Sequence, residues 1–476
     1  MKHFFVILVT YVFACATCAA AQVPAGDEVD AYVESEMAKQ HIPGLQLGVY
    51  RNGEIIKAKG YGLSNVELNV PVRAETIFQS GSIGKQFVAT AVMMLTEQGR
   101  LGLDDSITKF FWDAPAGWRN IRVRNLLSHT SGLGEYEADE NTRPGGPLNL
   151  RQDYTEEQLV KFAESLSMDF QPGEKWEYCN TNYLLLGVMI HRVTGKFYGD
   201  FLQERIFKPL GMANTRVIND ADIIPNRAAG YRLLNGELKN QEWVSPTFNS
   251  TADGTLYLNV LDLARWDSAL YTERLLKRAR LDEMWTVARL NSGQPNEWNY
   301  GFGWLVDAIN GHRVLEHSGS WQGFTAFIAR YVDDKLTVVV LTNLDSAHSF
   351  PGRIAHQVAS QYDPQLTPVN LEPIEDKEPQ VTAFVKSWLE NIAAGRANPD
   401  DFSPEVRADW FPKGVKQVEE HTKSLGSLKS LDLLERKQDG EQREYTYRGT
   451  FDNLKIVYCV TLNHDNKIVG FRPCKN

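Results

Sequence analysis

The chain has 476 residues, of which 43% are hydrophobic and 23% are charged. This composition is typical of a globular protein, and the length is enough for one large domain and a smaller one. The formal net charge of −10, without a cluster of Lys and Arg residues, argues against a surface that neutralises phosphates, so we expect no nucleic-acid partner.

The first residues have the pattern of a secretory signal peptide. A basic start is followed by an apolar run that falls short of the roughly 20 residues needed to span a membrane, and alanines occupy positions 19–21. We predict cleavage after Ala21, which would remove residues 1–21 and export the protein to the periplasm or the medium, without an integral membrane span. A retained membrane anchor, or a lipid on Cys15 or Cys18, is the alternative.

Three cysteines would remain after cleavage: Cys179, Cys459 and Cys474. They form no CxxC pair and lack the spacing of a zinc site, so the sequence predicts no metal centre. Export permits a disulfide, and only Cys459 and Cys474 lie near each other in the sequence. A bridge between these two and a pair of thiols both remain open; in the bridged form Cys179 would be free.

Strands are expected at the start of the mature domain. Alternating apolar residues on both sides of the turn Asn52-Gly53 predict a β-hairpin over residues 45–58. Apolar residues with a helical period then predict a helix over residues 82–98, which Gly99 would end.

The middle of the chain mixes loops with buried elements. Residues 131–155 are rich in Gly, Pro, Asn and acidic residues and predict a long loop, which could border a substrate site. Helices are predicted over 183–193 and 262–270, and a β-hairpin over 325–331 and 336–342. Together these elements indicate an α/β (α+β) domain.

A domain boundary is predicted at residues 363–380. This stretch holds four prolines and five acidic residues with one lysine, which is typical of an extended linker. The large domain would then cover residues 22–362. Residues 381–476 begin with a short amphipathic helix, and we expect a small C-terminal α+β domain whose role the sequence does not indicate. Its strands are expected at residues 444–451, 455–462 and 467–472.

Ser82 and Lys85 stand three residues apart at the start of the predicted helix 82–98. This spacing places a hydroxyl and an amine on one face of the first turn. If the amine is desolvated near the positive end of the helix dipole, its pKa falls and it can take the hydroxyl proton. The backbone N–H groups of the same turn can stabilise an oxyanion. The two residues are therefore a candidate nucleophile and base.

The Ser-x-x-Lys pattern is weak evidence when it stands alone, because Ser106 and Lys109 repeat it. No sustained helical period follows this second match, so we interpret it as a surface turn. The first match needs support from other motifs before it can be assigned a catalytic role.

Two further motifs accompany Ser82: Tyr178-Cys179-Asn180 before a buried helix, and His317-Ser318-Gly319-Ser320 just before a predicted strand. The stretches Leu126–Leu133 and Tyr300–Trp304 add to the pattern. With these motifs in this order, residues 29–361 resemble the class C β-lactamase-related family of penicillin-binding-protein-like serine hydrolases. This family includes β-lactamases, D-aminopeptidases, D-Ala-D-Ala carboxypeptidases and family VIII-type esterases.

The resemblance implies a β-lactamase/transpeptidase-like domain with an antiparallel sheet flanked by helices. It also implies that Ser82 is the nucleophile, Lys85 its activating partner and Tyr178 a general base or relay. An oxyanion would lie between the N–H groups of Ser82 and Ser320. No cofactor and no metal are implied. The substrate-binding residues would be Asn180, which orients a substrate amide, together with His317, Gly319 and Ser320.

The sequence has histidine at position 317, where β-lactamases and most penicillin-binding members of the family carry a lysine that holds the substrate carboxylate or polarises the tyrosine proton. A histidine here resembles what the aminopeptidase-like and esterase-like members use. An imidazole, with an ordinary pKa of about 6.5, can be uncharged at neutral pH. We therefore expect a serine hydrolase that cleaves a small amide, such as a D-amino-acid peptide, or an ester. A β-lactamase or a penicillin receptor that acylates without fast turnover is one alternative, and a non-catalytic binding protein that retains the fold is another. The sequence does not fix the oligomeric state.

Other residues near these motifs are left outside the predicted site. His129 is interpreted as a structural residue in a turn, because the Ser-Lys-Tyr set already supplies proton transfer. Trp321 and Gln322 either line the site or pack beside it. Cys179 is expected to point into the core.

Overall fold

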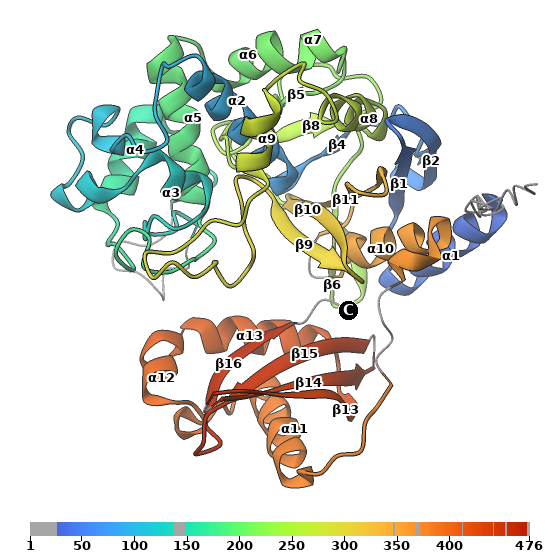
Figure 1. Ribbon diagram of the computed structural model, residues 1–476. Coiled ribbons are helices and arrows are strands. Elements are labelled where there is room, and N and C mark those ends of the chain that lie inside the picture. Colours follow the sequence, from blue (N-terminus) through green and yellow to red (C-terminus); the bar gives the residue numbers. More distant parts are fainter. Residues whose placement is uncertain are drawn as a thin grey trace, which may run out of the picture.

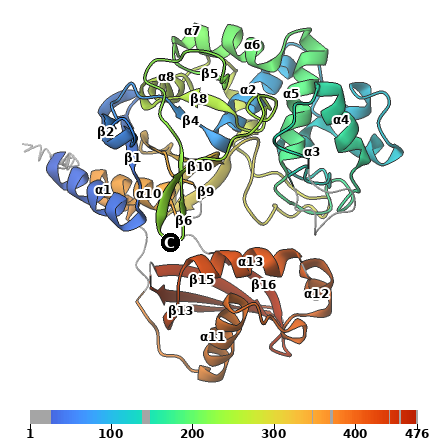
Figure 2. The same ribbon diagram turned by 180° about the vertical axis from the view of Figure 1, so that it is seen from behind.

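The computed structural model describes residues 26–137, 148–345, 348–367, 372–411, 413–440, 442–452 and 455–473. The expected signal peptide and Cys474 lie outside these residues. Two bodies are joined by one connecting segment: a large body coloured blue to orange, and a small body coloured orange to red (Figure 1). The view from behind shows the same separation (Figure 2).

A seven-stranded sheet, with strand order β3-β2-β1-β12-β11-β10-β9, organises the large body. Every neighbouring pair is antiparallel, and both hairpins predicted from the sequence are confirmed. The central strands are almost wholly buried, since layers cover both faces of the sheet. The strands are β1 Gly44–Arg51, β2 Glu54–Asn65, β3 Val70–Pro71, β9 Leu305–Ile309, β10 His312–Trp321, β11 Phe324–Tyr331 and β12 Leu336–Thr342.

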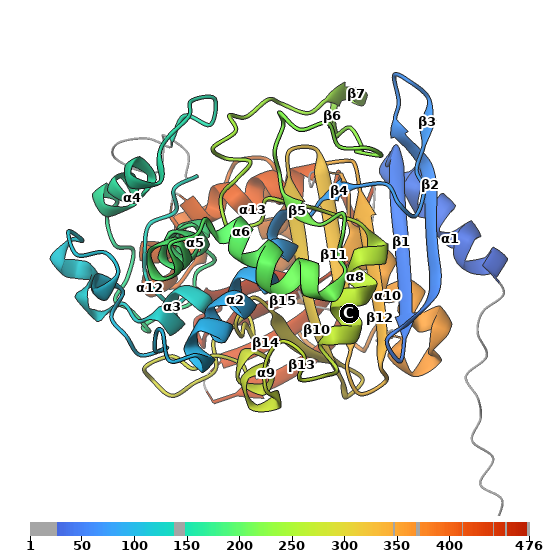
Figure 3. The same ribbon diagram turned by 90° about the horizontal axis from the view of Figure 1, so that it is seen from above.

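One face of the sheet is covered by the first and last helices of the large body, α1 (Gly26–Gln40) and α10 (Pro351–Tyr362). The other face packs against α8 (Val260–Ala269), and a helical region built around α2 (Lys85–Glu97) and α5 (Asn180–Thr194) lies beside it (Figure 3). Both α2 and α5 are largely buried, so their N-terminal ends meet inside the molecule. This meeting point carries two of the sequence motifs.

The remaining elements of the large body are short and connect these layers. They are β4 Phe78–Gln79, η1 Gly81–Gly84, η2 Ile107–Lys109, η3 Ala116–Asn120, α3 Val123–Leu127, α4 Glu156–Ser165, α6 Tyr198–Leu202, η4 Gln203–Phe207, α7 Lys208–Leu210, β5 Arg216–Val217, β6 Tyr231–Leu234, β7 Glu237–Asn240, β8 Leu256–Leu258, α9 Arg278–Met284 and η5 Pro364–Leu366.

Two predicted boundaries near the motifs were wrong. Ser82 does not lie in an α-helix but in the 3-10 turn η1, and α2 begins only at Lys85. The turn forms because Gly81 takes a positive φ of 50°, which other residues rarely adopt. The His317 motif lies inside β10 rather than before a strand, because β10 continues its pairing with β11 as far as Trp321.

The small body has a four-stranded antiparallel sheet with order β13-β14-β15-β16 and a hydrophobic core of its own. The sequence missed β13, because charged and polar residues interrupt the alternation that marked the other three strands. Cys459 on β15 is disulfide-bonded. Its elements are α11 Pro379–Ala393, η6 Pro399–Asp401, α12 Pro404–Trp410, α13 Lys413–Ser424, β13 Leu428–Asp439, β14 Gln442–Phe451, β15 Lys455–Leu462 and β16 Ile468–Pro473.

None of the helices in the described part of the chain has the length and hydrophobicity needed to cross a membrane.

The turn η1 and the strand β10 approach each other so closely that only glycines fit between them. A Cβ atom at Gly319 would lie 2.0 Å from the carbonyl oxygen of Ser80, and one at Gly81 would lie 2.2 Å from the nitrogen of Ser320. Both contacts are with backbone, which cannot move aside as a side chain can. The two glycines therefore bring the backbone of Ser320 against the turn that carries Ser82.

We predict that Gly319→Ala destabilises the large body by about 2 kcal/mol or more, since its methyl group must push two backbone segments apart. Urea denaturation followed by circular dichroism measures this change. Gly117→Ala is the matched control, because its Cβ would meet only a side-chain atom of Met168 at 3.7 Å. Equal midpoints for both variants would contradict the close approach.

Candidate active site

Ser82 and Lys85 lie together at the junction of η1 and α2. The Lys85 side chain is fully buried, whereas Ser82 is partly exposed and can meet a molecule from solvent. The Lys85 Nζ is 2.9 Å from the Ser82 Oγ. The hydroxyl of Ser80 donates to the Gly254 carbonyl at 2.8 Å and fixes the turn from the other side. The predicted nucleophile and its amine partner are therefore in direct contact.

Lys85 has three acceptors around its amino group. Besides the contact with Ser82, Nζ donates to the Asn180 Oδ1 at 2.8 Å and to the carbonyl oxygen of Asp253. Two N–H bonds are thus held by fixed acceptors, and the third position on nitrogen points at Ser82. In the ammonium form this position donates a proton to the Ser82 Oγ; in the amine form it is a lone pair that can accept the hydroxyl proton.

Tyr178 lies beside this pair. Its ring centre is 4.9 Å from the Lys85 Nζ. Burial raises the pKa of Tyr178, while the charge of Lys85 and the nearness of Lys85 and Ser82 to its hydroxyl pull the pKa back down. The buried Oη makes no hydrogen bond of ordinary geometry to the described residues. This hydroxyl is therefore close to the nucleophile and still able to bond a substrate atom.

His129 packs behind Tyr178, with ring centres 4.3 Å apart. Its Nδ1 accepts hydrogen bonds from the Cys179 backbone N–H and the Asn182 amide, each at 3.2 Å. Burial, together with the nearby charge of Lys85, holds the pKa of His129 well below its usual value. A neutral His129 thus packs against the ring of Tyr178, which agrees with the structural role predicted for it. Its φ of 56° places it in a turn.

His317 projects from β10 on the other side of the site and is buried. Its Nδ1 lies 2.6 Å from the Ser318 carbonyl oxygen, which can only accept, so Nδ1 carries a proton. Its Nε2 lies 2.9 Å from the Tyr300 hydroxyl, which can donate to a neutral ring or accept from a protonated one. Both ring nitrogens are therefore already engaged. The sequence motif around Tyr300 was noted, but its contact with His317 was not predicted.

Asn180 connects the site to the segment that follows Ser131. Its backbone N–H donates to the Glu135 carboxylate at 2.5 Å, and its side-chain amide donates to Glu137 at 3.2 Å. Because its N–H group is bound by Glu137, the Oδ1 of Asn180 is turned toward Lys85. The carboxylate of Glu135 also caps α5, whose own N-cap residue offers no side-chain bond.

A third carboxylate lies near these two. Asp253 accepts a hydrogen bond from the Tyr136 hydroxyl at 2.7 Å, and its own backbone carbonyl contacts Lys85. Burial and the neighbouring carboxylates raise the pKa values of both Glu135 and Glu137. The sequence showed only an acid-bearing loop here, because the contacts join residues more than 40 positions apart.

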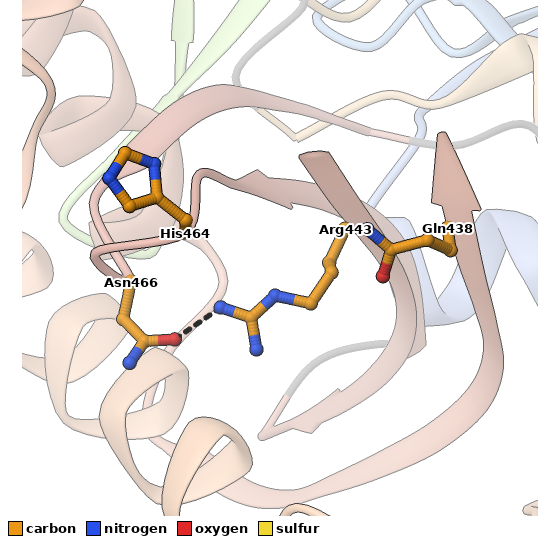
Figure 4. A pocket seen from close by; sticks show the side chains of 4 residues that line it. All are labelled: Gln438, Arg443, His464 and Asn466. Atoms are coloured by element: carbon orange, nitrogen blue, oxygen red, sulfur yellow. Dashed lines mark hydrogen bonds between the residues drawn. The ribbon is translucent and has the colours of Figure 1, made fainter. Parts of the chain in front are cut away.

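The small body has an open hollow on its surface (Figure 4). It is lined by Gln438, Arg443, His464 and Asn466. The Arg443 guanidinium is paired with Glu378 and also donates to Asn466. None of these four described lining residues is a serine, threonine or cysteine, so the candidate site for a serine hydrolase lies in the large body.

The fold and the Ser-Lys-Tyr arrangement are those of the β-lactamase-fold family, which includes serine acyl-transferases and hydrolases. Residues 29–363 match the Beta-lactamase family, and the chain belongs to this family. The resemblance noted in the sequence and the predicted fold class are both confirmed.

Two curated relatives cover most of the large body. Penicillin-binding protein 4* of Bacillus subtilis (strain 168) is 31% identical over 307 residues, which cover 61% of this chain and 66% of that protein. Protein flp of Staphylococcus aureus (strain MRSA252) is 27% identical over 329 residues, covering 67% of this chain and 63% of that protein. Both matches span less than two thirds of the relative's length.

Solved structures resemble either most of the chain or about 71% of it. The octameric penicillin-binding protein homologue from Pyrococcus abyssi shares the fold over 94% of this chain and 96% of its own, with 24% identity and a TM-score of 0.63. A D-stereospecific amidohydrolase from Streptomyces sp. is 27% identical, with a TM-score of 0.57, over 71% of this chain and 99% of its own. D-amino acid amidase from Ochrobactrum anthropi SV3 is 26% identical, with a TM-score of 0.58, over 71% and 97%.

We predict that Glu137→Gln makes stability less dependent on pH. Burial and neighbouring carboxylates raise the pKa of Glu137 from 4.5 to about 8, so the native chain holds this proton more tightly than the unfolded chain. The stability that this proton contributes is complete below pH 4.5 and is lost as the pH rises to about 8.

The urea midpoint of the wild type should therefore fall between pH 5 and pH 8 by more than that of Glu137→Gln, whose amide can still accept from Asn180. Glu237→Gln, at an exposed position, is the control and should behave as the wild type. A variant whose midpoint falls as steeply as that of the wild type would show that Glu137 is not buried among acids.

Proposed function

We propose that the protein is a serine hydrolase that works through an acyl-enzyme on Ser82. The observation that supports this best is the contact of Ser82 with a fully buried lysine whose other two N–H groups are held by Asn180 and Asp253. The third position on the nitrogen of this lysine faces the Ser82 hydroxyl, as a base for a serine nucleophile requires.

The reaction begins when the Ser82 Oγ attacks a carbonyl carbon and its proton passes to Lys85. The oxygen of the tetrahedral intermediate is stabilised by the N–H groups of Ser82 and Ser320, since Gly81 and Gly319 allow their backbones to approach. Tyr178, whose hydroxyl is free to bond a substrate atom, relays a proton to the leaving group. Water activated by Tyr178 or Lys85 then releases the acyl group.

The substrate we propose is a small amide, such as a D-amino-acid amide or peptide, or an ester. Two structural relatives at 26–27% identity are a D-amino acid amidase and a D-stereospecific amidohydrolase. The state of His317 supports the same choice. A ring whose two nitrogens are both engaged by protein groups is a poor binding partner for a substrate carboxylate.

The family offers a second candidate, a penicillin receptor or a β-lactamase. It is favoured by the relatives named as penicillin-binding proteins. The engaged His317 argues against it, since it replaces a charged lysine. We keep the hydrolase of neutral amides or esters as the proposal, and we propose export, on the pattern of the first 21 residues, as its location.

We predict that Ser82→Ala abolishes both labelling by a fluorophosphonate and turnover of p-nitrophenyl esters or D-alanyl amides, with a loss of at least about a thousand-fold. Intact-mass spectrometry and absorbance assays measure these effects. Ser106→Ala is the matched control from the second Ser-x-x-Lys pattern, where Ser106 caps a turn and the exposed Lys109 pairs with Asp105. Labelling that survives Ser82→Ala would exclude the proposed nucleophile.

The substrate class is predicted from the same preparation. Steady turnover of an ester or a D-amino-acid amide should exceed hydrolysis of a penicillin, because the site has no free cation at position 317 for the penicillin carboxylate. Stoichiometric and long-lived penicillin labelling with no ester or amide turnover would instead support the receptor. A protein that is neither labelled nor active under any condition would be a binding protein that retains the fold.

A further inference from the structure

A stacked pair of tryptophans lies next to the proposed catalytic residues. The rings of Trp176 and Trp298 have centres 5.5 Å apart and planes that differ by 27°. Trp298 is 42% exposed, which is unusual for so large an apolar side chain. The two residues come from separate segments, one leading into α5 and the other leading into β9.

This pair continues the aromatic surface of the site. The ring centre of Trp176 is 6.4 Å from that of Tyr178 and 5.9 Å from that of Tyr300. Tyr178 lies over the Lys85 amino group, and Tyr300 bonds His317. The aromatic rings therefore run from the nucleophile's base outward to the exposed face of Trp298.

Backbone contacts hold the two segments in place before any substrate arrives. The backbone N–H of Asn291 donates to the Gly173 carbonyl at 2.8 Å, and its side-chain amide donates to the Pro172 carbonyl at 2.9 Å. The buried Asn296 amide donates to the Tyr300 carbonyl at 2.8 Å and also accepts from the Tyr300 N–H at 2.9 Å. A surface fixed in this way loses little entropy when it binds a flat group.

We propose that the stacked pair Trp176–Trp298 is the leaving-group subsite of the enzyme and takes a flat, uncharged group such as an aryl ester or anilide. This inference rests on the proposed function. As the bond between Ser82 and the acyl carbon forms, the bond from that carbon to the leaving oxygen or nitrogen breaks, and the leaving atom takes the serine proton through Tyr178. The leaving group must therefore depart beside Tyr178, where Trp176 begins the aromatic surface.

The choice of an uncharged group follows from the nearest polar neighbours. Both ring nitrogens of His317 are already engaged, by the Ser318 carbonyl and the Tyr300 hydroxyl, so this ring is not directed at a carboxylate on the leaving group. A flat apolar group can stack on the exposed ring of Trp298.

The test compares two acetate esters whose leaving groups have similar acidity but different shapes: phenyl acetate and hexafluoroisopropyl acetate. The readout is the ratio of their kcat/KM values, so that a general loss of activity cancels. We expect Trp298→Ala to lower the phenyl-to-fluoroalkyl ratio about 5- to 10-fold, the size of effect that loss of one stacking partner gives. Trp298→Phe should restore most of it.

The matched control is Trp112→Ala, which removes an indole that is 74% exposed and packs with Arg192. It should leave the ratio at the wild-type value. An unchanged ratio in Trp298→Ala would overturn the proposal. A choline ester that depends on Trp298 as strongly as the phenyl ester does would overturn its restriction to uncharged groups, because cations also bind indole faces.

A binding measurement separates this proposal from the proposed function. Calorimetric titration with 2-naphthol needs no turnover, and its Kd should rise about 5- to 10-fold in Trp298→Ala. If the protein binds 2-naphthol through Trp298 but hydrolyses nothing, the binding subsite is supported and the proposed hydrolase function is contradicted. If the protein hydrolyses esters but binds 2-naphthol equally with and without Trp298, the hydrolase function is supported and the proposed subsite is contradicted.

Discussion

Burial of the Lys85 amino group is the constraint on which the rest of the site depends. An amine removed from water must have its N–H groups bonded, and here Asn180 and Asp253 accept two of them. Each acceptor needs support in turn. Glu137 turns the Asn180 amide, and Tyr136 bonds the Asp253 carboxylate. Residues 135–137, in the acidic segment after Ser131, therefore hold the two groups that bind the Lys85 amino group.

The same constraint explains why the motifs come from three parts of the fold. The turn before α2 supplies Ser82 and Lys85, the start of α5 supplies Tyr178 and Asn180, and β10 supplies His317. Glycines at the contact of η1 with β10 let these parts meet. Antiparallel pairing across the centre of the sheet fixes β10.

The sequence predicted the fold class, both hairpins and the proximity of Lys85 to Ser82, but not the contact of Lys85 with Asp253. It succeeded because alternation and short motifs are local properties of the chain. It failed where geometry depends on distant contacts. The 3-10 turn at Ser82 and the extension of β10 through His317 are set by partners more than 150 residues away or on the next strand. The hydrogen bonds from Asn180 to Glu135 and Glu137 could not be predicted from the local sequence, because acidic residues in a loop are usually exposed to solvent.

The stacked pair of Trp176 and Trp298 was missed for the same reason. Each tryptophan alone is unremarkable in sequence, and only the folded chain brings two segments more than 100 residues apart into one stack. The family motifs include the residues around Ser82, but they do not include Trp176 or Trp298, on the side where we propose that the leaving group binds. Differences of substrate within one fold are expected to arise there.

The most direct test of the account is to trap its covalent intermediate. The protein is mixed with p-nitrophenyl acetate, quenched in acid within the first turnover, digested and analysed by tandem mass spectrometry. An acetyl group on the peptide that contains Ser82, on the serine itself, is the result that the account predicts. Turnover without any acetylated peptide, or an acetyl group on another residue, would contradict it.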